Sequence, residues 1–221
     1  QDPYSSLNPR RTIGQALTEP LRVHGLASGR AARDRAASLL DEVGMPPSAL
    51  DRYPHEFSGG QRQRIGIARA LTVEPELLIA DEPVSALDVS VQAQVLLLLR
   101  DLQRRRNLAF VFVSHDLGVV RWFCDRVAVM YLGRIVEEGG VGEVFAEPLH
   151  PYARVLRDAS PVPDPSGRGA LPRIVGEIPS AANPPSGCHF HPRCAHVRDE
   201  CRAAYPAWRQ QRERGAACVL V

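Results

Sequence analysis

Apolar residues recur at helical spacing in the first part of the chain and predict three helices there. Residues 12–25 and 30–43 form two of them, and Gly44 after the second favours a helix end. The second segment places its apolar residues on one face: Ala32, Ala36, Leu39, Leu40 and Val43. A third helix is predicted to begin at Ser58, because apolar residues after it recur in the same way. They are Ile65, Ala68 and Leu71, with Thr72 on the same face.

Two short apolar runs, at 77–80 and 110–113, have the length and composition of buried parallel strands. A helix is predicted between them from an apolar stripe of Val91, Val95, Leu98, Leu99 and Leu102. Residues 127–131 and 135–137 flank a turn, and together they predict a β-hairpin. Further along, residues 161–185 are rich in proline, glycine and serine, which predicts an extended and poorly packed segment.

The composition is that of a globular protein, with 44% hydrophobic and 24% charged residues. No apolar run reaches the roughly eighteen residues that a membrane-spanning helix needs, and no signal peptide is visible. The net charge of +2 provides no overall field that would attract nucleic acid, so no nucleic-acid partner is predicted.

All 27 basic residues are arginine, and this bears directly on nucleotide binding. A phosphate-binding P-loop requires a lysine that reaches the β- and γ-phosphates, and no G-x-x-x-x-G-K-[ST] pattern occurs. The sequence also starts at Gln1 and not at a methionine. We therefore expect the chain to be the C-terminal portion of a longer protein.

Two features of the central segment nevertheless predict phosphate chemistry. Ser58 is a suitable N-cap, and Gly59 and Gly60 leave the first-turn N–H groups of the helix uncovered, so that the helix start forms an anion site. Asp81 stands at the carboxyl end of a predicted strand, where nucleotide-binding sheets hold Mg²⁺. The adjacent Glu82 is placed to take a proton from an attacking water.

The central segment resembles the ATP-binding-cassette (ABC) ATPases. Their signature, Walker B and D-loop motifs occur here in the family's order and spacing as FSGGQ, LLIADEP and SALD. The only departure is Phe57 in place of the usual leucine. The resemblance implies an α/β fold, with part of a P-loop NTPase core, a helical subdomain and a small cysteine-containing C-terminal extension. It also implies ATP and Mg²⁺ as cofactors.

This resemblance implies that two subunits dimerise head to tail. The signature residues of one subunit would face the ATP bound by the other: Ser58, Gly59, Gly60 and Gln61. Asp88 would link the two sites. Hydrolysis would use Asp81 through Mg²⁺ and Glu82 as the base.

Two more motifs complete the implied site. VFVSHDL resembles the H-loop, so that His115 would contact the γ-phosphate and orient the water. QDPYSSLNPR, at the start of the chain, is similar to the Q-loop of the peptide-importer ATPases. Gln1 would then contact the metal and the attacking water, and its loop would lead to the groove that receives a permease.

The tail narrows the resemblance to ATPases of oligopeptide and dipeptide importers. The run from PLHPY to IPSAANPPSGCHFHPRC is similar to their C-terminal extension. The implied domains are residues 1–73 with the Q-loop and helical subdomain, 74–146 with the core motifs, and 147–221 with the extension. The Q-loop and the helices of residues 12–72 would form the permease groove.

The implied function is that of an ATP-hydrolysing subunit of a peptide-type importer, peripheral on the cytoplasmic face of the membrane. Its implied partners are a second ABC ATPase subunit, transmembrane permease subunits and an extracytoplasmic substrate-binding protein. Two alternatives stay open: a soluble ABC protein of DNA repair or translation, and an inactive truncated remnant. The cargo also stays open, because related importers of nickel or sugars share much of this pattern.

Four cysteines fall in the tail: Cys188, Cys194, Cys201 and Cys218. A tail this small and rich in proline needs a staple, and a reducing compartment disfavours disulfides. Zinc could take four thiolates or borrow His189 or His191, but its ligands usually come as C-x₂₋₄-C pairs, which are absent here. A [4Fe–4S] cluster tolerates varied spacings, and the resembling importers include members with one. The cluster is therefore favoured over Zn²⁺, with free thiols as the remaining alternative.

Overall fold

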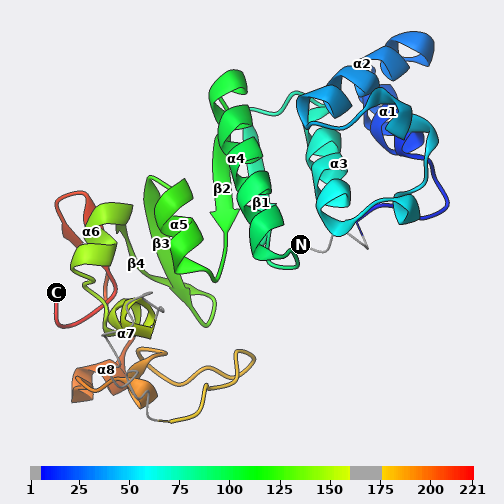
Figure 1. The fold of residues 1–221 in the computed structure, drawn as a ribbon. Coiled ribbons are helices and arrows are strands. Elements are labelled where there is room, and N and C mark those ends of the chain that lie inside the picture. Colours follow the sequence, from blue (N-terminus) through cyan, green and yellow to red (C-terminus); the bar gives the residue numbers. More distant parts are fainter. Residues whose placement is uncertain (1–5, 160–175) are drawn as a thin grey trace. The chain divides into compact units, whose positions relative to one another are not determined.

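A computed structural model describes residues 6–159 and 176–221 of the chain. The chain divides into two compact units, Gln1–His115 and Asp116–Val221 (Figure 1). The first unit contains helices and a two-stranded sheet, and the second contains a four-stranded sheet together with the cysteine tail. The fold is therefore of the mixed helix-and-sheet kind that the sequence predicts. The boundaries of the three predicted domains stay predictions.

The first part of the first unit consists of α1 (Ile13–Val23), α2 (Gly29–Glu42) and α3 (Gly59–Leu71), which confirms the three predicted helices. Short 3₁₀ turns at Pro47–Asp51 and Pro54–Glu56 connect α2 to α3. The apolar faces of the helices meet in a core of fully buried side chains: Ile13, Leu17, Leu21, Leu40, Ile65 and Leu71. Each such side chain contributes about 1.5–3 kcal/mol by leaving water, so packing of these faces holds the helices together.

The second part of this unit is a parallel pair of strands, β1 (Leu77–Asp81) and β2 (Ala109–Val113), connected by α4 (Val89–Arg106). The register places Asp81 opposite Val113, so the carboxyl ends of both strands lie at the same edge. This edge is where parallel sheets place ligand-binding residues. It carries the residues of the candidate site.

The prediction that both strands are buried is wrong for one face of the sheet. Leu77 and Ile79 are 51% and 67% exposed, and Val111 and Val113 are 48% and 47% exposed. Side chains alternate between the two faces along a strand, so these four residues share one face. Ala80 points to the opposite face and is buried. Among the residues that the structure describes, no third strand pairs with β1 or β2, and the apolar face stays open.

Arginine side chains connect the helices of the first unit. Arg106 near the end of α4 donates to both carboxylate oxygens of Glu42 in α2, at 2.9 and 2.7 Å. Arg64 of α3 donates to the backbone carbonyl of Val43 at 2.8 Å. Such charge-assisted hydrogen bonds are stronger than neutral ones, so α2, α3 and α4 are held together by more than their apolar faces.

The second unit begins with α5 (Leu117–Phe123) and the antiparallel hairpin of β3 (Arg126–Tyr131) and β4 (Arg134–Gly140). The predicted hairpin is thus confirmed. Two helices follow it, α6 (Val141–Ala146) and α7 (Pro151–Ala159).

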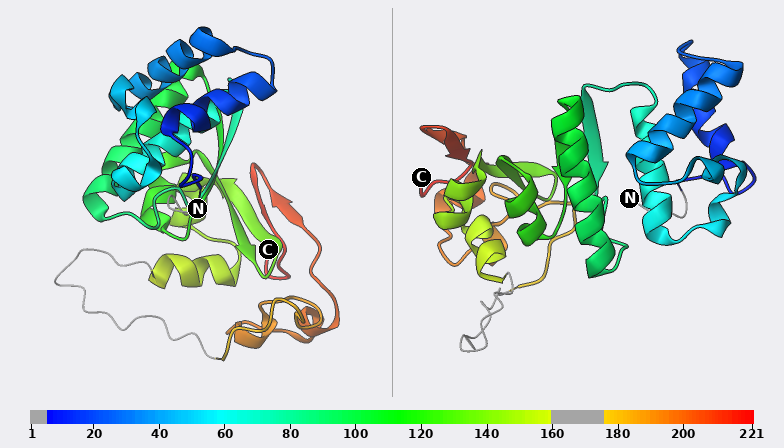
Figure 2. Two further views of the ribbon diagram at one scale, coloured as in Figure 1. Left: turned by 90° about the vertical axis from the view of Figure 1, so that its right-hand side faces the viewer. Right: turned by 45° about the horizontal axis from the view of Figure 1, so that its top comes forward.

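The tail adds two strands that the sequence pattern does not predict. β5 (Arg209–Gln211) pairs with β6 (Arg214–Ala216), and β6 pairs with β4, which gives the strand order β3-β4-β6-β5. Figure 2 shows these strands beside the hairpin. The cysteine region contains a 3₁₀ turn, His191–Arg193, and α8 (Asp199–Ala203). Residues 176–185 of the proline-rich segment contain no helix or strand, and the rest of that segment lies outside the described residues.

A buried carboxylate holds the start of α7. Glu137 on β4 is fully buried, and its oxygens accept hydrogen bonds from the backbone N–H groups of Leu149 and His150 at 2.9 and 2.7 Å. Burial raises the pKa of Glu137, and the two N–H donors oppose that rise. Nδ1 of His150 accepts from the N–H of Tyr152 at 3.1 Å, and burial lowers the pKa of His150 to about 4. A neutral imidazole therefore caps this helix.

An aromatic cluster fastens the tail to the hairpin. The ring of Tyr131 lies 4.6 Å from that of Tyr152 and 5.3 Å from that of Phe190, and Tyr152 and Phe190 are also 5.3 Å apart. Aromatic pairs at these distances stabilise beyond the apolar area that they bury. The PLHPY run thus has a structural role, because it starts α7 and supplies one of the three rings.

Candidate functional site

Glu82 lies directly after β1 in an unusual backbone conformation. Its N–H donates to the carbonyl of Val113 at 2.9 Å, which extends the pairing of β1 and β2 by one residue. Its φ is +44°, in the left-handed region that residues other than glycine rarely occupy. Such strain persists only where the surrounding structure imposes it, and it gathers at functional sites.

The structure brings His115 next to Glu82. His115 comes two residues after the end of β2, and Nδ1 of its ring is 3.1 Å from Oε1 of Glu82, within hydrogen-bond distance. The His115 side chain is 73% exposed and that of Glu82 is 28% exposed, so water can reach the pair. Asp81, the last residue of β1, is also exposed at this edge. Three residues predicted from two separate motifs are thus placed by two neighbouring strand ends.

The residues at this edge fit Mg²⁺, which prefers carboxylate oxygens and water and usually keeps only one or two protein ligands. Asp81 offers such a carboxylate. The described residues contain no group of three acidic, histidine or cysteine side chains that could hold a metal by themselves. A cation here would therefore take its remaining ligands from phosphate oxygens and water.

Ser58 and Gln61 form a reciprocal cap at the start of α3. Oγ of Ser58 accepts from the N–H of Gln61 at 3.4 Å, and Oε1 of Gln61 accepts from the N–H of Ser58 at 3.0 Å. This cap does not use the first-turn N–H groups of Gly59 and Gly60. These are the groups that the sequence predicts to bind an anion.

Gly60 has a second reason to be glycine that the sequence does not reveal. A Cβ atom at this position would lie only 2.4 Å from Cγ1 of Val91, in the first turn of α4. No real Cβ contact is that short, so with any larger residue at position 60 either the Val91 side chain or the two helices would have to shift. The start of the signature helix is therefore packed directly against the start of α4.

Asp88 is the N-cap of α4. Its Oδ1 accepts from the hydroxyl of Ser90 at 2.8 Å and from the N–H of Val91 at 3.0 Å. The Ser90 hydroxyl and then the Val91 N–H hold the pKa of Asp88 below its usual value, because both stabilise the ionised carboxylate. The D-loop aspartate thus also fixes the helix that follows it.

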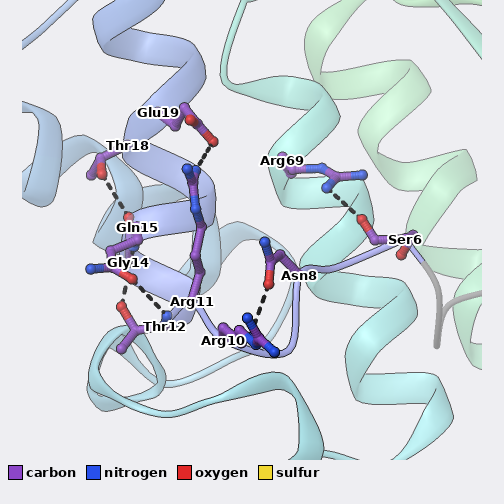
Figure 3. Close-up of polar contacts among 10 residues, drawn as sticks. All are labelled: Ser6, Asn8, Arg10, Arg11, Thr12, Gly14, Gln15, Thr18, Glu19 and Arg69. Atoms are coloured by element: carbon purple, nitrogen blue, oxygen red, sulfur yellow. Dashed lines mark hydrogen bonds and ion pairs between the residues drawn. The ribbon is translucent and has the colours of Figure 1, made fainter.

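Gln1 lies outside the described residues, so its predicted contacts stay a prediction. The segment just after it is attached to the signature helix, because Arg69 of α3 donates to the carbonyl of Ser6 at 2.6 Å (Figure 3). Farther along, Oδ1 of Asn8 accepts from the N–H of Arg10 at 3.0 Å in the turn that precedes α1. Arg69 is a contact that sequence analysis missed, because one arginine on an amphipathic helix gives no signal.

The four tail cysteines line one small cavity: Cys188, Cys194, Cys201 and Cys218. Its volume of about 10 Å³ is close to what a single water molecule needs. Burial raises the pKa of three of these thiols, those of Cys188, Cys194 and Cys218. In the described ranges, however, no three cysteine, histidine or acidic side chains are arranged to hold a metal ion. The four cysteines thus lie around one cavity, and their predicted role as ligands of a cluster or of zinc stays a prediction.

Comparisons with known proteins decide the family. A family model described as "ABC transporter" matches residues 1–85, and one described as "Oligopeptide/dipeptide transporter, C-terminal region" matches residues 136–201. A putative peptide import ATP-binding protein of Brucella ovis is 54% identical over 212 residues, which make up 96% of this chain and 67% of that protein. The chain belongs to the ABC transporter family.

Two further relatives of this ABC protein are named for oligopeptide transport. OppF of Escherichia coli is 51% identical over the whole chain and 67% of its own length. AppF of Bacillus subtilis is 52% identical over 95% of the chain and 64% of its own length. The chain therefore spans about two thirds of the length of these relatives.

Solved structures agree with the family. The ATP-binding cassette MJ0796, a dimer in a post-hydrolysis state with ADP and Pi, is 32% identical and covers 61% of this chain and 59% of its own, with a TM-score of 0.54. CbiO1 of Clostridium perfringens is 31% identical and covers 66% and 57%, with a TM-score of 0.57. The predicted fold, a partial ABC ATPase core, is confirmed.

Proposed function

We propose that this ABC protein is the ATP-hydrolysing subunit of a peptide importer. The observation that carries the proposal is the 3.1 Å contact between His115 and Glu82 beside Asp81, at the carboxyl edge of β1 and β2. A carboxylate held at an exposed strand end, with an imidazole fixed against it, is suited to orient and deprotonate a water molecule. Membership of the ABC family indicates what this water would attack, namely the γ-phosphate of ATP.

Each residue at the edge has its own task in this proposal. Glu82 accepts a proton from the water, and its left-handed backbone fixes the direction of the side chain. His115 holds the Glu82 carboxylate by its Nδ1 contact, and its other ring nitrogen would contact the γ-phosphate. Asp81 would hold Mg²⁺, which when bound neutralises charge on the phosphates.

The signature and D-loop residues would act on a second subunit. The Gly59 and Gly60 N–H groups at the start of α3 offer donors to the phosphates of an ATP bound by a partner, with Ser58 and Gln61 keeping that helix start in shape. Asp88 would connect the two sites. The 221 residues contain no lysine, so we infer that turnover needs a P-loop from outside this sequence. By itself the chain should not hydrolyse ATP.

A polar groove in the first unit supports a permease as partner. It has a volume of about 770 Å³ and is lined by α1, α2 and the turn before α1, with arginines 10, 11, 22 and 33 among its residues. Arg11 pairs with Glu19, as Figure 3 shows, and Arg33 pairs with Asp51. The groove is open and carries positive charge, so we propose that it receives a cytoplasmic helix of the permease. Crosslinks from the permease that reach only the cysteine tail would contradict this.

The proposed location is the cytoplasmic face of the cell membrane, where the permease and, across the membrane, a substrate-binding protein complete the importer. No helix in the described ranges combines the length and apolarity that crossing a membrane requires. Peptide as cargo rests on the names of the relatives and on the match of residues 136–201.

We also propose that the four-cysteine cavity binds a [4Fe–4S] cluster, with a single Zn²⁺ as the alternative. The shared cavity supports the proposal, but the thiols would have to turn toward a common centre. Protein purified without oxygen should contain about four irons per chain, and Cys194→Ser should lose them. Cys124→Ser, which changes a cysteine outside the tail, is the control. One zinc per chain without iron would favour the alternative, and metal-free protein would overturn both.

The importer function is tested in lipid vesicles that contain the permease, the substrate-binding protein and this ABC protein extended by P-loop residues. Peptide should stimulate ATP hydrolysis, and Glu82→Gln should abolish the stimulated rate. Hydrolysis that ignores both peptide and permease would contradict import and favour a soluble ABC ATPase. A chain that hydrolyses nothing even when extended and assembled would favour an inactive remnant.

A further inference from the structure

The turn between the two strand-end carboxylates and α4 is held by a side chain that no motif includes. Gln92, in the first turns of α4, donates from Nε2 to the carbonyl of Val84 at 2.9 Å and to the carbonyl of Leu87 at 3.1 Å. An amide NH₂ group has two hydrogens, and both are used here. Both contacts are partly buried, where a hydrogen bond is less weakened by competing water.

The rest of the turn is closed by bonds of its own. The N–H and the hydroxyl of Ser85 donate to the carbonyl of Glu82 at 3.3 and 3.1 Å, and the N–H of Leu87 donates to the carbonyl of Val84 at 3.2 Å. The far end is the Asp88 cap of α4. Gln92 is the one contact in this set that reaches back from the body of α4 into the middle of the turn.

The geometry requires a donor of this length. Glutamate at position 92 would turn carboxylate oxygens toward two carbonyl oxygens, and leucine has a similar size but donates nothing. In both cases two partly buried carbonyls would lose a partner. The turn would then be held only by its own short bonds.

We propose that Gln92 is a positioning residue: its two hydrogen bonds, the Gln92 clamp, fix the turn from Glu82 to Asp88 on α4. The clamp thereby sets where the carboxylates of Asp81 and Glu82 stand during ATP hydrolysis. The effect of Gln92 on turnover rests on the proposed function, whereas its hydrogen bonds to the turn do not depend on that function. The side chain of Gln92 acts through backbone carbonyls, and its backbone N–H makes the first hydrogen bond of α4 to the carbonyl of Asp88, at 2.8 Å. The neighbouring residue Val91 packs against Gly60, so the same turn of α4 also contacts the start of α3.

The clamp is tested first by amide hydrogen exchange on the chain as it stands. Gln92→Leu and Gln92→Glu should speed exchange of the Leu87 N–H by about tenfold or more, as expected when two hydrogen bonds that close a local turn are lost. Gln94→Leu is the matched control, because the Gln94 amide lies two residues away and makes one long, exposed contact, 3.4 Å from Arg64. Gln92→Lys keeps donors on a stem of similar reach and should restore part of the protection. Unchanged exchange in both Gln92→Leu and Gln92→Glu would overturn the clamp.

The positioning role is tested by turnover in the assembled, P-loop-bearing enzyme. Gln92→Leu should lower kcat by about tenfold and leave KM for ATP within about twofold, because it alters orientation and not nucleotide contacts. Faster exchange without a change in kcat would overturn the positioning role and leave the proposed function intact. A wild-type enzyme without turnover would instead overturn the proposed function, and the exchange result would then decide the clamp alone.

Discussion

Nδ1 of His115 lies 3.1 Å from Oε1 of Glu82, across the carboxyl ends of two parallel strands. The two residues are 33 positions apart in the sequence, and the strand register brings them together. The contact holds the imidazole of His115 against the carboxylate of Glu82 at the edge where Asp81 also stands. In the proposed function Glu82 takes the proton from water and His115 holds Glu82 in place.

The first prediction concerns His115. In the P-loop-bearing enzyme, His115→Ala should lower kcat by on the order of 10²-fold, as the loss of other preorganised contacts at a reacting centre does. His24→Ala, which changes an exposed histidine at the end of α1, should leave the rate unchanged. Steady-state ATP hydrolysis measures both. An unchanged rate in His115→Ala would reduce the contact with Glu82 to a structural one.

The second prediction concerns the contact between Gly60 and Val91. Gly60→Ala should destabilise the chain by about 1–3 kcal/mol, because its Cβ would overlap Cγ1 of Val91. Gly66→Ala in the same helix is the control, since its Cβ would meet no atom within 4 Å. That change should stabilise by about 0.5–1 kcal/mol, because alanine favours a helix more than glycine does. Urea unfolding measures both.

A double substitution sharpens this prediction. Adding Val91→Ala to Gly60→Ala removes the overlapping methyl groups, so the pair should be more stable than the sum of the single effects by about 1 kcal/mol or more. Strict additivity would show that α3 and α4 do not meet at this contact.

The third prediction is a dependence of stability on pH in metal-free protein. The unfolded chain protonates His150 near its usual pKa of 6.5, whereas the folded chain does so only near 4. Acidification from 6.5 to 4 therefore favours unfolding, by as much as about 3 kcal/mol. Glu137 opposes this, because its raised pKa lets the folded state take up a proton first. The charges of Arg214 and Arg154 act in the other direction and lower the pKa of Glu137.

The His150→Asn variant separates these effects. Asparagine can still accept the hydrogen bond from Tyr152 at the start of α7, but it does not titrate. The difference in unfolding free energy between wild type and variant should change between pH 7 and pH 4.5 in the direction that favours the variant on acidification. A difference that stays constant over that range would contradict the burial of a neutral imidazole.

Much of this site is predictable from sequence because its elements are local. Ser58 and Asp88 cap the helices that follow them, and Asp81 and Glu82 end a strand, so short-range patterns find all four. The contacts between elements are different. Neither the packing of Val91 on Gly60 nor the hydrogen bonds of Gln92 leaves a periodic signal, because each depends on how two elements meet.

Parts of the fold are also hidden from sequence patterns because they depend on contacts between elements. β5 (Arg209–Gln211) is three polar, exposed residues, so no alternation marks it as a strand, and it forms only by pairing with β6. The apolar run of β1 predicts a strand that is buried on both faces, because a continuous apolar run has no period from which an exposed face could be recognised. The cavity shared by the cysteines likewise depends on tertiary packing.

The most direct test of the account is the rate of ATP hydrolysis by Glu82→Gln in the assembled, P-loop-bearing enzyme, measured beside Glu76→Gln. Glutamine keeps the shape of Glu82 but cannot take a proton from water, so turnover should fall to background while ATP-bound dimers accumulate. Glu76 is exposed just before β1, and its substitution should leave turnover at the wild-type rate. Wild-type turnover in Glu82→Gln would contradict the account, because the base would then have to be another group.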